Sequence, residues 1–134
     1  KFTMISIAII EEEHIANAVS VTRQNMADEG FGVIRQSMIS TAVSELATNA
    51  YVHAGHGTVT IAILGGDKGK GIEITVEDHG PGIANLEMAM KEGYSTAGSL
   101  GVGLPGTKRL SDEFSIRSTV DEGTVAVIRA WLDR

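Results

Sequence analysis

The sequence predicts an α/β fold, a two-layer sandwich in which a mixed, mostly antiparallel sheet carries helices on one face. Thr58–Leu64 and Gly71–Glu77 alternate apolar with polar or small residues, as strands with one buried face do. A turn-rich segment joins them, which indicates a hairpin. The stretch from about Val33 to Ala54 instead spaces its apolar residues as a helix does. Strands joined by short turns favour an antiparallel sheet covered by such helices.

The remaining elements follow from the same patterns. Met4–Ile10 is an apolar run that predicts a first strand, and Glu11–Glu13 place acidic groups where a helix begins. That first helix is expected to end at Gly30, and the second at Gly55. The later elements expected are a helix from Leu104 to Asp112 and the strands Phe114–Thr119 and Thr124–Leu132.

Composition narrows the class of protein. The 134 residues suit one domain, 1–134, with a single core. The net charge of −6 would repel a phosphate backbone, so nucleic acid is not expected as a partner. There is no cysteine, and the longest strongly apolar run has seven residues against the roughly 20 that span a bilayer. We therefore expect a soluble cytoplasmic protein that does not bind membranes.

Two polar residues lie on the apolar side of the second predicted helix. At about 100° per residue, Glu45 and Asn49 fall beside Met38 and Ala42, one above the other. Burying a carboxylate and an amide without partners costs a few kcal/mol or more. Either both side chains hydrogen-bond to a neighbouring loop, or they serve a site.

A glycine-rich turn follows the strand that ends at Glu77. In Asp78-His79-Gly80-Pro81-Gly82, Gly80 and Gly82 would let a ligand approach the backbone, and Asp78 could accept a hydrogen bond from an amino group. The simpler interpretation is an ordinary turn, because Gly-Pro-Gly is turn chemistry in any case. By itself this motif is a weak to moderate signal.

A second glycine-rich loop precedes the helix that begins near Pro105. Gly98, Gly101 and Gly103 would leave the backbone N–H groups at a helix start accessible to a ligand. Such N–H groups can bind an anion. The alternative is a flexible loop that happens to precede a helix. Alone, Gly-x-Gly is a weak indication of a binding site. Glu45 and Asn49 on one helix, followed by both glycine-rich loops in this order, form a much more specific pattern.

With these elements in place, the sequence resembles the GHKL superfamily of ATPases and kinases, which has the Bergerat ATP-binding fold. The matching motifs are the N box Glu45–Ala50, the first glycine box Asp78–Gly82, the second glycine box Gly101–Leu104, and Gly123-Thr124. The resemblance extends over essentially the whole chain. Within the superfamily it points to the small anti-sigma-factor-type Ser/Thr kinases, and the segment Glu92–Leu110 is most similar to stressosome switch kinases of the RsbT type.

The resemblance implies a role for each matching residue. Asn49 would bind Mg²⁺ through its amide oxygen, and Glu45 would be the general base that takes a proton from the attacking hydroxyl. Asp78 would accept a hydrogen bond from the adenine amino group, and Thr124 would support the adenine. Gly80 and Gly82 would let the backbone fold against the nucleotide. Gly98, Gly101 and Gly103 would form the lid and the phosphate cradle, and the nucleotide-binding residues would also include Val102 and Leu104.

One departure from the family pattern concerns phosphate neutralisation. Anti-sigma kinases often carry a basic residue just before the second glycine box, whereas Gly93–Leu100 contains none. Mg²⁺ and backbone amides would then neutralise the phosphate, unless Lys108 or Arg109 helps. For that pair a solvated helix face is the simpler interpretation. His53, His56 and His79 match no common zinc spacing.

The function implied is that of an ATP-dependent protein serine/threonine kinase in bacterial stress signalling. Its substrate would be a Ser or Thr of a STAS-domain antagonist or scaffold protein, and phosphorylation would release the kinase to switch on an output enzyme of phosphatase or cyclase type. The main alternative is a binding module, in which ATP only sets the conformation of a partner-switching protein. A fragment of a sensor histidine kinase is a third possibility, disfavoured by the short segment between the glycine boxes.

Overall fold

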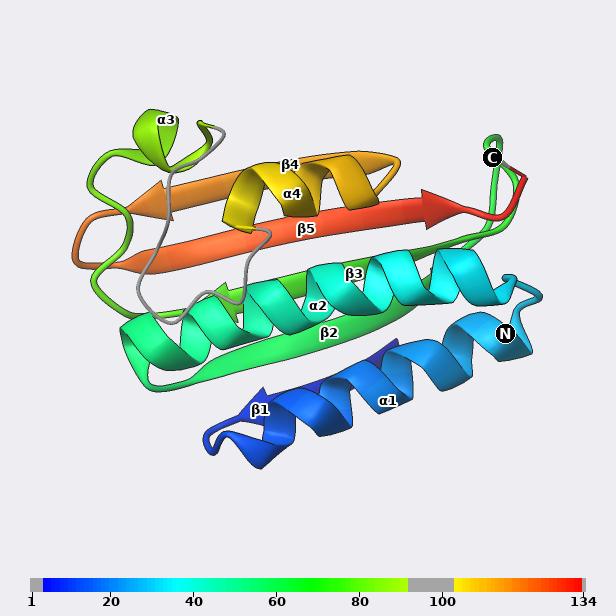
Figure 1. Ribbon diagram of the computed structural model, residues 1–134, viewed down its shortest axis with the longest axis horizontal. Helices are drawn as coiled ribbons and strands as arrows, with labels where there is room; N and C mark the ends of the chain where they lie inside the picture. Colours follow the sequence, from blue (N-terminus) through cyan, green and yellow to red (C-terminus); the bar gives the residue numbers. More distant parts are fainter. Residues whose placement is uncertain (1–3, 92–102, 134) are drawn as a thin grey trace.

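The computed structural model describes residues 4–91 and 103–133, which form one sheet with helices packed on one of its faces (Figure 1). The sheet has the order β1-β2-β3-β5-β4, and each of its four strand pairings is antiparallel. Its strands are β1 (Met4–Ile9), β2 (Gly57–Leu64), β3 (Gly71–Asp78), β4 (Glu113–Thr119) and β5 (Gly123–Trp131). The predicted two-layer sandwich is therefore confirmed, and its described strands pair more regularly than a mixed sheet would.

Three helices cover the sheet face turned toward the viewer in Figure 1. They are α1 (Glu13–Asp28), α2 (Val33–Ala54) and α4 (Gly103–Leu110). The central one, α2, contacts α1 and α4 on its flanks as well as β2, β3 and β5 beneath it. It ends where the sequence predicts, because Gly55 adopts the left-handed conformation with a φ of 78°.

The position of α2 between neighbours changes which of its residues are buried. Ser40 and Thr48, which helical spacing places with the polar residues of this helix, are 3% and 9% exposed because α1 and α4 cover the flanks of the helix. Ile34, which the same spacing places in line with Met38 and Ala42, is 76% exposed because it lies in the first turn, beyond most of the core. Helical spacing predicted the helix, but not how many sides of it are buried.

Element boundaries differ from expectation where side chains or pairing decide them. Asp78 is the last residue of β3 rather than the first residue after it, because it pairs with Thr124 of β5. The helix α4 ends at Leu110, and the backbone N–H of Asp112 donates to the Arg129 carbonyl instead. The short helix α3 (Leu86–Ala89), which the sequence did not predict, is capped by the Asn85 side chain.

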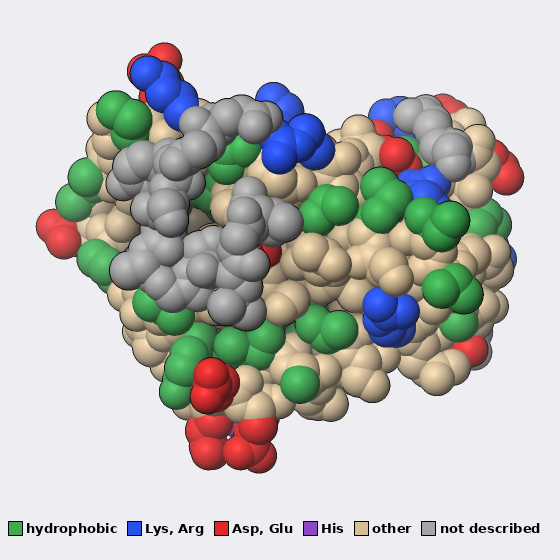
Figure 2. All heavy atoms as spheres, viewed as in Figure 1, with side chains coloured by type: hydrophobic (Ala, Val, Ile, Leu, Met, Phe, Trp, Pro, Cys, Tyr) green, Lys and Arg blue, Asp and Glu red, His purple; other side chains and the backbone are tan. Residues whose placement is uncertain are grey.

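The start of α1 depends on a histidine rather than on the acidic residues alone. Nδ1 of His14 accepts hydrogen bonds from the backbone N–H groups of Ile10 and Glu11, each at 3.1 Å. The acidic side chains of Glu11–Glu13 are exposed around this turn, and acidic groups gather there at the lower left of Figure 2. The His14 side chain thus fixes the backbone of the turn that precedes α1.

The outer face of the sheet is held by an ionic cluster around Glu113. Its carboxylate accepts hydrogen bonds from Nζ of Lys68 at 2.8 Å, Nε1 of Trp131 at 2.6 Å and a guanidinium nitrogen of Arg129 at 3.1 Å. Arg129 also pairs with Glu73 on β3 at 2.7 Å. The hydrogen bonds from Lys68 and Trp131 lower the pKa of Glu113 from 4.5 to about 2. The cluster joins β3, β4 and β5 to the β2–β3 turn.

This cluster predicts how stability depends on pH. Since the folded pKa of Glu113 is below its unfolded value, its contribution is complete above about pH 4.5 and is lost as pH falls toward about 2. Glu113→Gln should lower the free energy of unfolding near neutral pH, and its deficit relative to wild type should shrink across that acid range. Urea unfolding at several pH values measures this, with Glu122→Gln, in the exposed β4–β5 turn, as the control. A deficit that does not change with pH would contradict the assignment.

Candidate functional site

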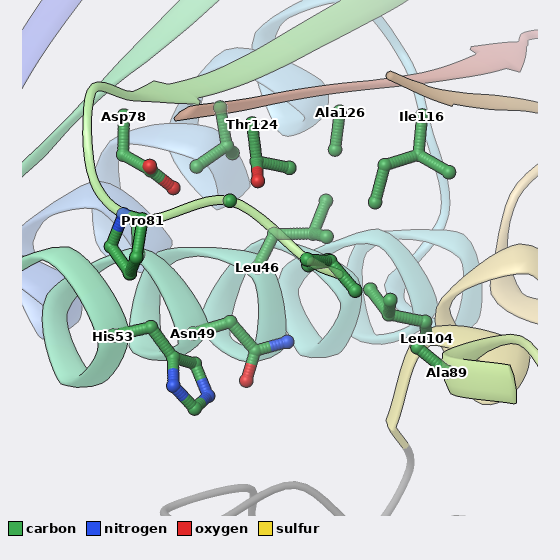
Figure 3. Close-up of a pocket in the computed structure, with 14 residues that line it drawn as sticks. Leu46, Asn49, His53, Asp78, Pro81, Ala89, Leu104, Ile116, Thr124 and Ala126 are labelled. Atoms are coloured by element: carbon green, nitrogen blue, oxygen red, sulfur yellow. The ribbon is translucent and has the colours of Figure 1, made fainter. Parts of the chain in front are cut away.

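A cavity of about 210 Å³ opens between α2 and the adjacent ends of β3 and β5 (Figure 3). The Gly-Pro-Gly turn after β3, the first turn of α4, and residues of α3 and β4 complete its walls. Apolar side chains of the sheet and of α2 make up much of the surface. The residues that line it are Leu46, Asn49, Ala50, His53, Val76, Asp78, Pro81, Gly82, Ile83, Ala89, Leu104, Ile116, Thr124 and Ala126. The N box, the first glycine box and the second glycine box thus each contribute residues to one cavity: Asn49, Gly82 and Leu104 are examples.

The polar end of the cavity is built by the pairing of β3 with β5. Asp78 and Thr124 are register partners on these strands, and Figure 3 shows their side chains next to each other, directed toward α2. Oδ1 of Asp78 accepts a hydrogen bond from the backbone N–H of Gly80 at 2.9 Å. That bond orients the carboxylate, which can still accept from a ligand.

Ser118, which sequence reasoning missed, connects the surrounding backbone. Its hydroxyl accepts a hydrogen bond from the backbone N–H of Ile83 at 2.7 Å and lies 2.8 Å from the Thr124 hydroxyl. The backbone N–H of Asp121, in the β4–β5 turn, also donates to the Pro81 carbonyl at 2.8 Å. These contacts tie the Gly-Pro-Gly turn to the end of the sheet. A lone serine in a strand carries no sequence signal for this role.

Gly80 and Gly82 allow backbone contacts that no other residue could make. A Cβ on Gly80 would overlap Cβ of Ala54, at the end of α2. A Cβ on Gly82, where φ is 76°, would overlap the carbonyl oxygen of Thr119. The turn therefore lies directly against both α2 and β4. The Asp78–Gly82 motif is therefore a tight turn, and the same turn also forms one wall of the cavity.

Asn49 brings an unsatisfied oxygen to the site. Its side chain lines the cavity, and its Oδ1 is buried without a hydrogen-bond partner in the part of the chain that the structure describes. Leaving a buried acceptor unpaired costs about 1–3 kcal/mol, so an atom of this kind in a cavity wall is a candidate contact for a ligand, an ion or a water molecule. An amide oxygen is a ligand that Mg²⁺ accepts. No group of three or more His, Asp or Glu side chains able to hold a metal occurs in the described ranges, so a metal here would need other oxygens as well.

Glu45 is only 4% exposed and lies one turn before Asn49 on α2. The prediction from helical spacing that Glu45 lies on the buried side of this helix is confirmed. It does not belong to the residues that line the cavity. Its carboxylate is thus held inside the protein, next to the cavity and not in its wall.

The structure describes only the end of the second glycine-rich loop, from Gly103 onward. Gly98, Gly101 and Val102 lie outside the described residues. Gly103 begins α4 with a φ of 63°, and Leu104 is 6% exposed and lines the cavity. The start of α4 therefore reaches the site, as the motif predicts.

The candidate basic residues lie at the other end of α4. Lys108 and Arg109 are exposed in its last turn and do not line the cavity. This agrees with their interpretation as a helix face. His53 does line it, one turn after Asn49, and both side chains leave α2 on the same side in Figure 3. The spacing of four in Glu45, Asn49 and His53 was the signal that could have identified it.

Comparison with known proteins agrees with this geometry. Residues 10–130 match the model of the histidine kinase-like ATPase domain. The chain belongs to this family. Membership of this family implies that the chain binds ATP.

The chain is also similar to curated bacterial proteins. It is 44% identical over 126 residues to the serine/threonine-protein kinase RsbT of Bacillus subtilis, an alignment that covers 94% of this chain and 95% of RsbT. It is 34% identical over 101 residues to the anti-sigma F factor of Priestia megaterium, covering 70% and 68% of the two chains. Nearly the full length of RsbT thus has a counterpart here.

Solved structures show the same fold. The structure of RsbU and RsbW domains from Mycobacterium tuberculosis superposes with a TM-score of 0.68 at 19% identity, over 97% of this chain and 32% of that larger one. The mycobacterial sensor histidine kinase MprB gives 0.56 at 19% identity, over 98% and 97%. At these identities the likeness establishes the fold of the histidine kinase-like ATPase domain alone.

The Gly80 contact provides a direct test of the site. Gly80→Ala should push the turn away from Ala54 and weaken ATP binding about tenfold or more, a cost of at least ~1.4 kcal/mol. Adding Ala54→Gly should restore part of the affinity, because it removes the closest atom that the new methyl group meets and leaves Cα of Ala54 in place. Isothermal titration with ATP measures both. Gly65→Ala is the matched control, since a Cβ there meets nothing within 4 Å. Unchanged affinity in Gly80→Ala would show that the turn does not form the nucleotide site.

Proposed function

We propose that this chain, a protein serine/threonine kinase like RsbT, phosphorylates a Ser or Thr of a STAS-domain antagonist or scaffold protein. Phosphorylation would release the kinase to switch on a downstream output enzyme of phosphatase or cyclase type, in the cytoplasm, as part of stressosome signalling. The observation that carries the proposal is the buried, unpaired Oδ1 of Asn49 in the wall of the cavity. The extent of the similarity to RsbT supports the kinase class.

The cavity can hold the adenine end of ATP. Val76 and Ala126 provide apolar surface for the base, and Asp78 beside Thr124 provides the acceptor for its amino group. Pockets that enclose a whole small ligand measure roughly 300–1,000 Å³. A volume of about 210 Å³ instead suits the base and sugar, with the phosphates extending along α2 past Asn49. An acceptor at Asp78 would select adenine over guanine, which has a carbonyl at the corresponding position.

The phosphate end depends on Asn49 and on the residues next to it. The Asn49 amide oxygen would hold Mg²⁺, which when bound neutralises phosphate charge. His53 lies one turn further along the same side of α2, where its ring can donate a hydrogen bond to a phosphate oxygen. No described residue lining the cavity is a lysine or arginine, so His53 is the proposed substitute for the missing basic residue.

Glu45 is the proposed general base. It lies on α2 one turn before Asn49, so a carboxylate and the metal-binding amide follow each other along one helix. In this role Glu45 would accept the proton of the substrate hydroxyl as that oxygen attacks the terminal phosphate. Its burial implies that the protein substrate must reach α2 at this point to deliver the hydroxyl.

A second function is favoured by one observation. Glu45 is 4% exposed and does not line the cavity, a position that also suits a carboxylate with a structural role. In that case ATP would set the conformation of a partner-switching module without phosphoryl transfer. The similarity to anti-sigma F factors is compatible with such a module.

One variant separates the two functions. Glu45→Gln keeps the size of the side chain but removes the base, so phosphate transfer to a purified STAS-domain antagonist should fall about 10²–10⁴-fold while ATP affinity stays near wild type. Transfer is followed with ATP labelled in the γ-phosphate. Glu12→Gln, at the exposed start of α1, is the control. Wild-type protein that binds ATP and partner but transfers no phosphate would favour the binding module.

A further inference from the structure

The ring of His56 connects the C-terminal end of α2 to the turn after β3. The residue lies between α2 and β2 and is half-buried. Its Nδ1 lies 3.0 Å from the carbonyl oxygen of Ala54, the last residue of α2. Its Nε2 lies 3.2 Å from the backbone nitrogen of His79, in the turn after β3. Both ring nitrogens are therefore in hydrogen bonds to backbone, one at the end of α2 and the other in the turn after β3.

These partners assign the tautomer of the ring. The His79 backbone N–H can only donate, so Nε2 of His56 must accept with its lone pair. Nδ1 then carries the proton and donates to the Ala54 carbonyl, one of the last carbonyls of α2, which have no partner within the helix. The ring is neutral in this arrangement, and both of its polar atoms are satisfied.

The position of the bridge relates it to nucleotide binding. Residue 79 stands between Asp78, whose carboxylate lines the cavity, and Gly80, whose N–H orients that carboxylate. Gly80 in turn lies against Ala54, whose carbonyl receives the Nδ1 bond. His56 thus holds the end of α2, the helix of Asn49, at a fixed distance from the turn of Asp78.

The other groups that face His56 do not replace this bridge. The His79 ring stacks on it, with centroids 6.2 Å apart and planes inclined by 14°. Nε2 of His79 in turn lies 3.8 Å from a carboxylate oxygen of Glu77. Stacking keeps the two rings parallel, but only the hydrogen bonds reach the backbone on both sides.

We propose that His56 is a positioning residue for nucleotide binding, which holds the turn of Asp78 against the C-terminal end of α2. This rests on the proposed function only in taking ATP as the ligand of the cavity. The two roles of the ring, hydrogen bonding and stacking, can be separated by substitution. His56→Phe keeps a ring for His79 but removes both hydrogen bonds, whereas His56→Gln loses the ring but keeps an acceptor and a donor.

The test measures ATP affinity by isothermal titration, KM and kcat for phosphate transfer, and hydrogen exchange of the His79 amide. In His56→Phe the dissociation constant and KM for ATP should rise about fivefold or more, with a smaller change in kcat, and the His79 amide should exchange faster. His56→Gln should recover most of the affinity and protection. His14→Phe is the matched control, because it removes a histidine that accepts backbone N–H bonds at the start of α1.

The outcomes are distinguishable. Wild-type protein that does not bind ATP would overturn the proposed function, and the positioning role with it. Wild-type protein that binds ATP, with a His56→Phe variant of equal affinity and equal His79 exchange, would overturn the positioning role alone. The same follows if Phe retains affinity and Gln loses it, because stacking would then be the active feature. Should His56→Phe not fold, equal affinity and exchange in His56→Ala would overturn the positioning role in the same way.

Discussion

The structure of the site depends on the close contact between the turn after β3 and the C-terminal end of α2. Gly80 lies so near Ala54 that even a methyl group in its place would overlap the helix. Because α2 is the helix of Glu45 and Asn49, while the turn follows Asp78, this one contact decides the spacing between the two sets of polar groups. If the backbones were separated by a side chain, the cavity would be wider and its walls would no longer face a common ligand.

The rest of the fold keeps this contact in place. The pairing of β3 with β5 brings Thr124 beside Asp78, and Ser118 ties the returning chain at Ile83 to the same edge. On the outer face, the carboxylate of Glu113 joins neighbouring strands, so the sheet is held from the side away from the site. The Asn49 amide oxygen in the wall of this cavity has no hydrogen-bond partner among the described residues.

Much of this was predictable because it depends on local patterns. Helical spacing placed Glu45 inside the protein and Asn49 beside it at the cavity wall, and glycine positions marked the turn after β3 and the start of α4. What was not predictable depends on contacts between distant segments. Ser118 and His56 act through backbone groups far from them in sequence, and a single polar residue in a strand or loop does not reveal such a partner. The exposure of Ile34 likewise depends on where the core ends, which periodicity does not contain.

We infer that this cavity binds Mg-ATP. Nuclear magnetic resonance can test the inference, by titrating the ¹⁵N-labelled chain with a non-hydrolysable ATP analogue, with and without Mg²⁺. The largest shifts should occur at Asp78, Gly80 and Thr124, and the Asn49 side-chain amide should shift only when Mg²⁺ is present. Shifts confined to the outer face of the sheet, around Thr75 and Val127, or no shifts at all, would contradict it.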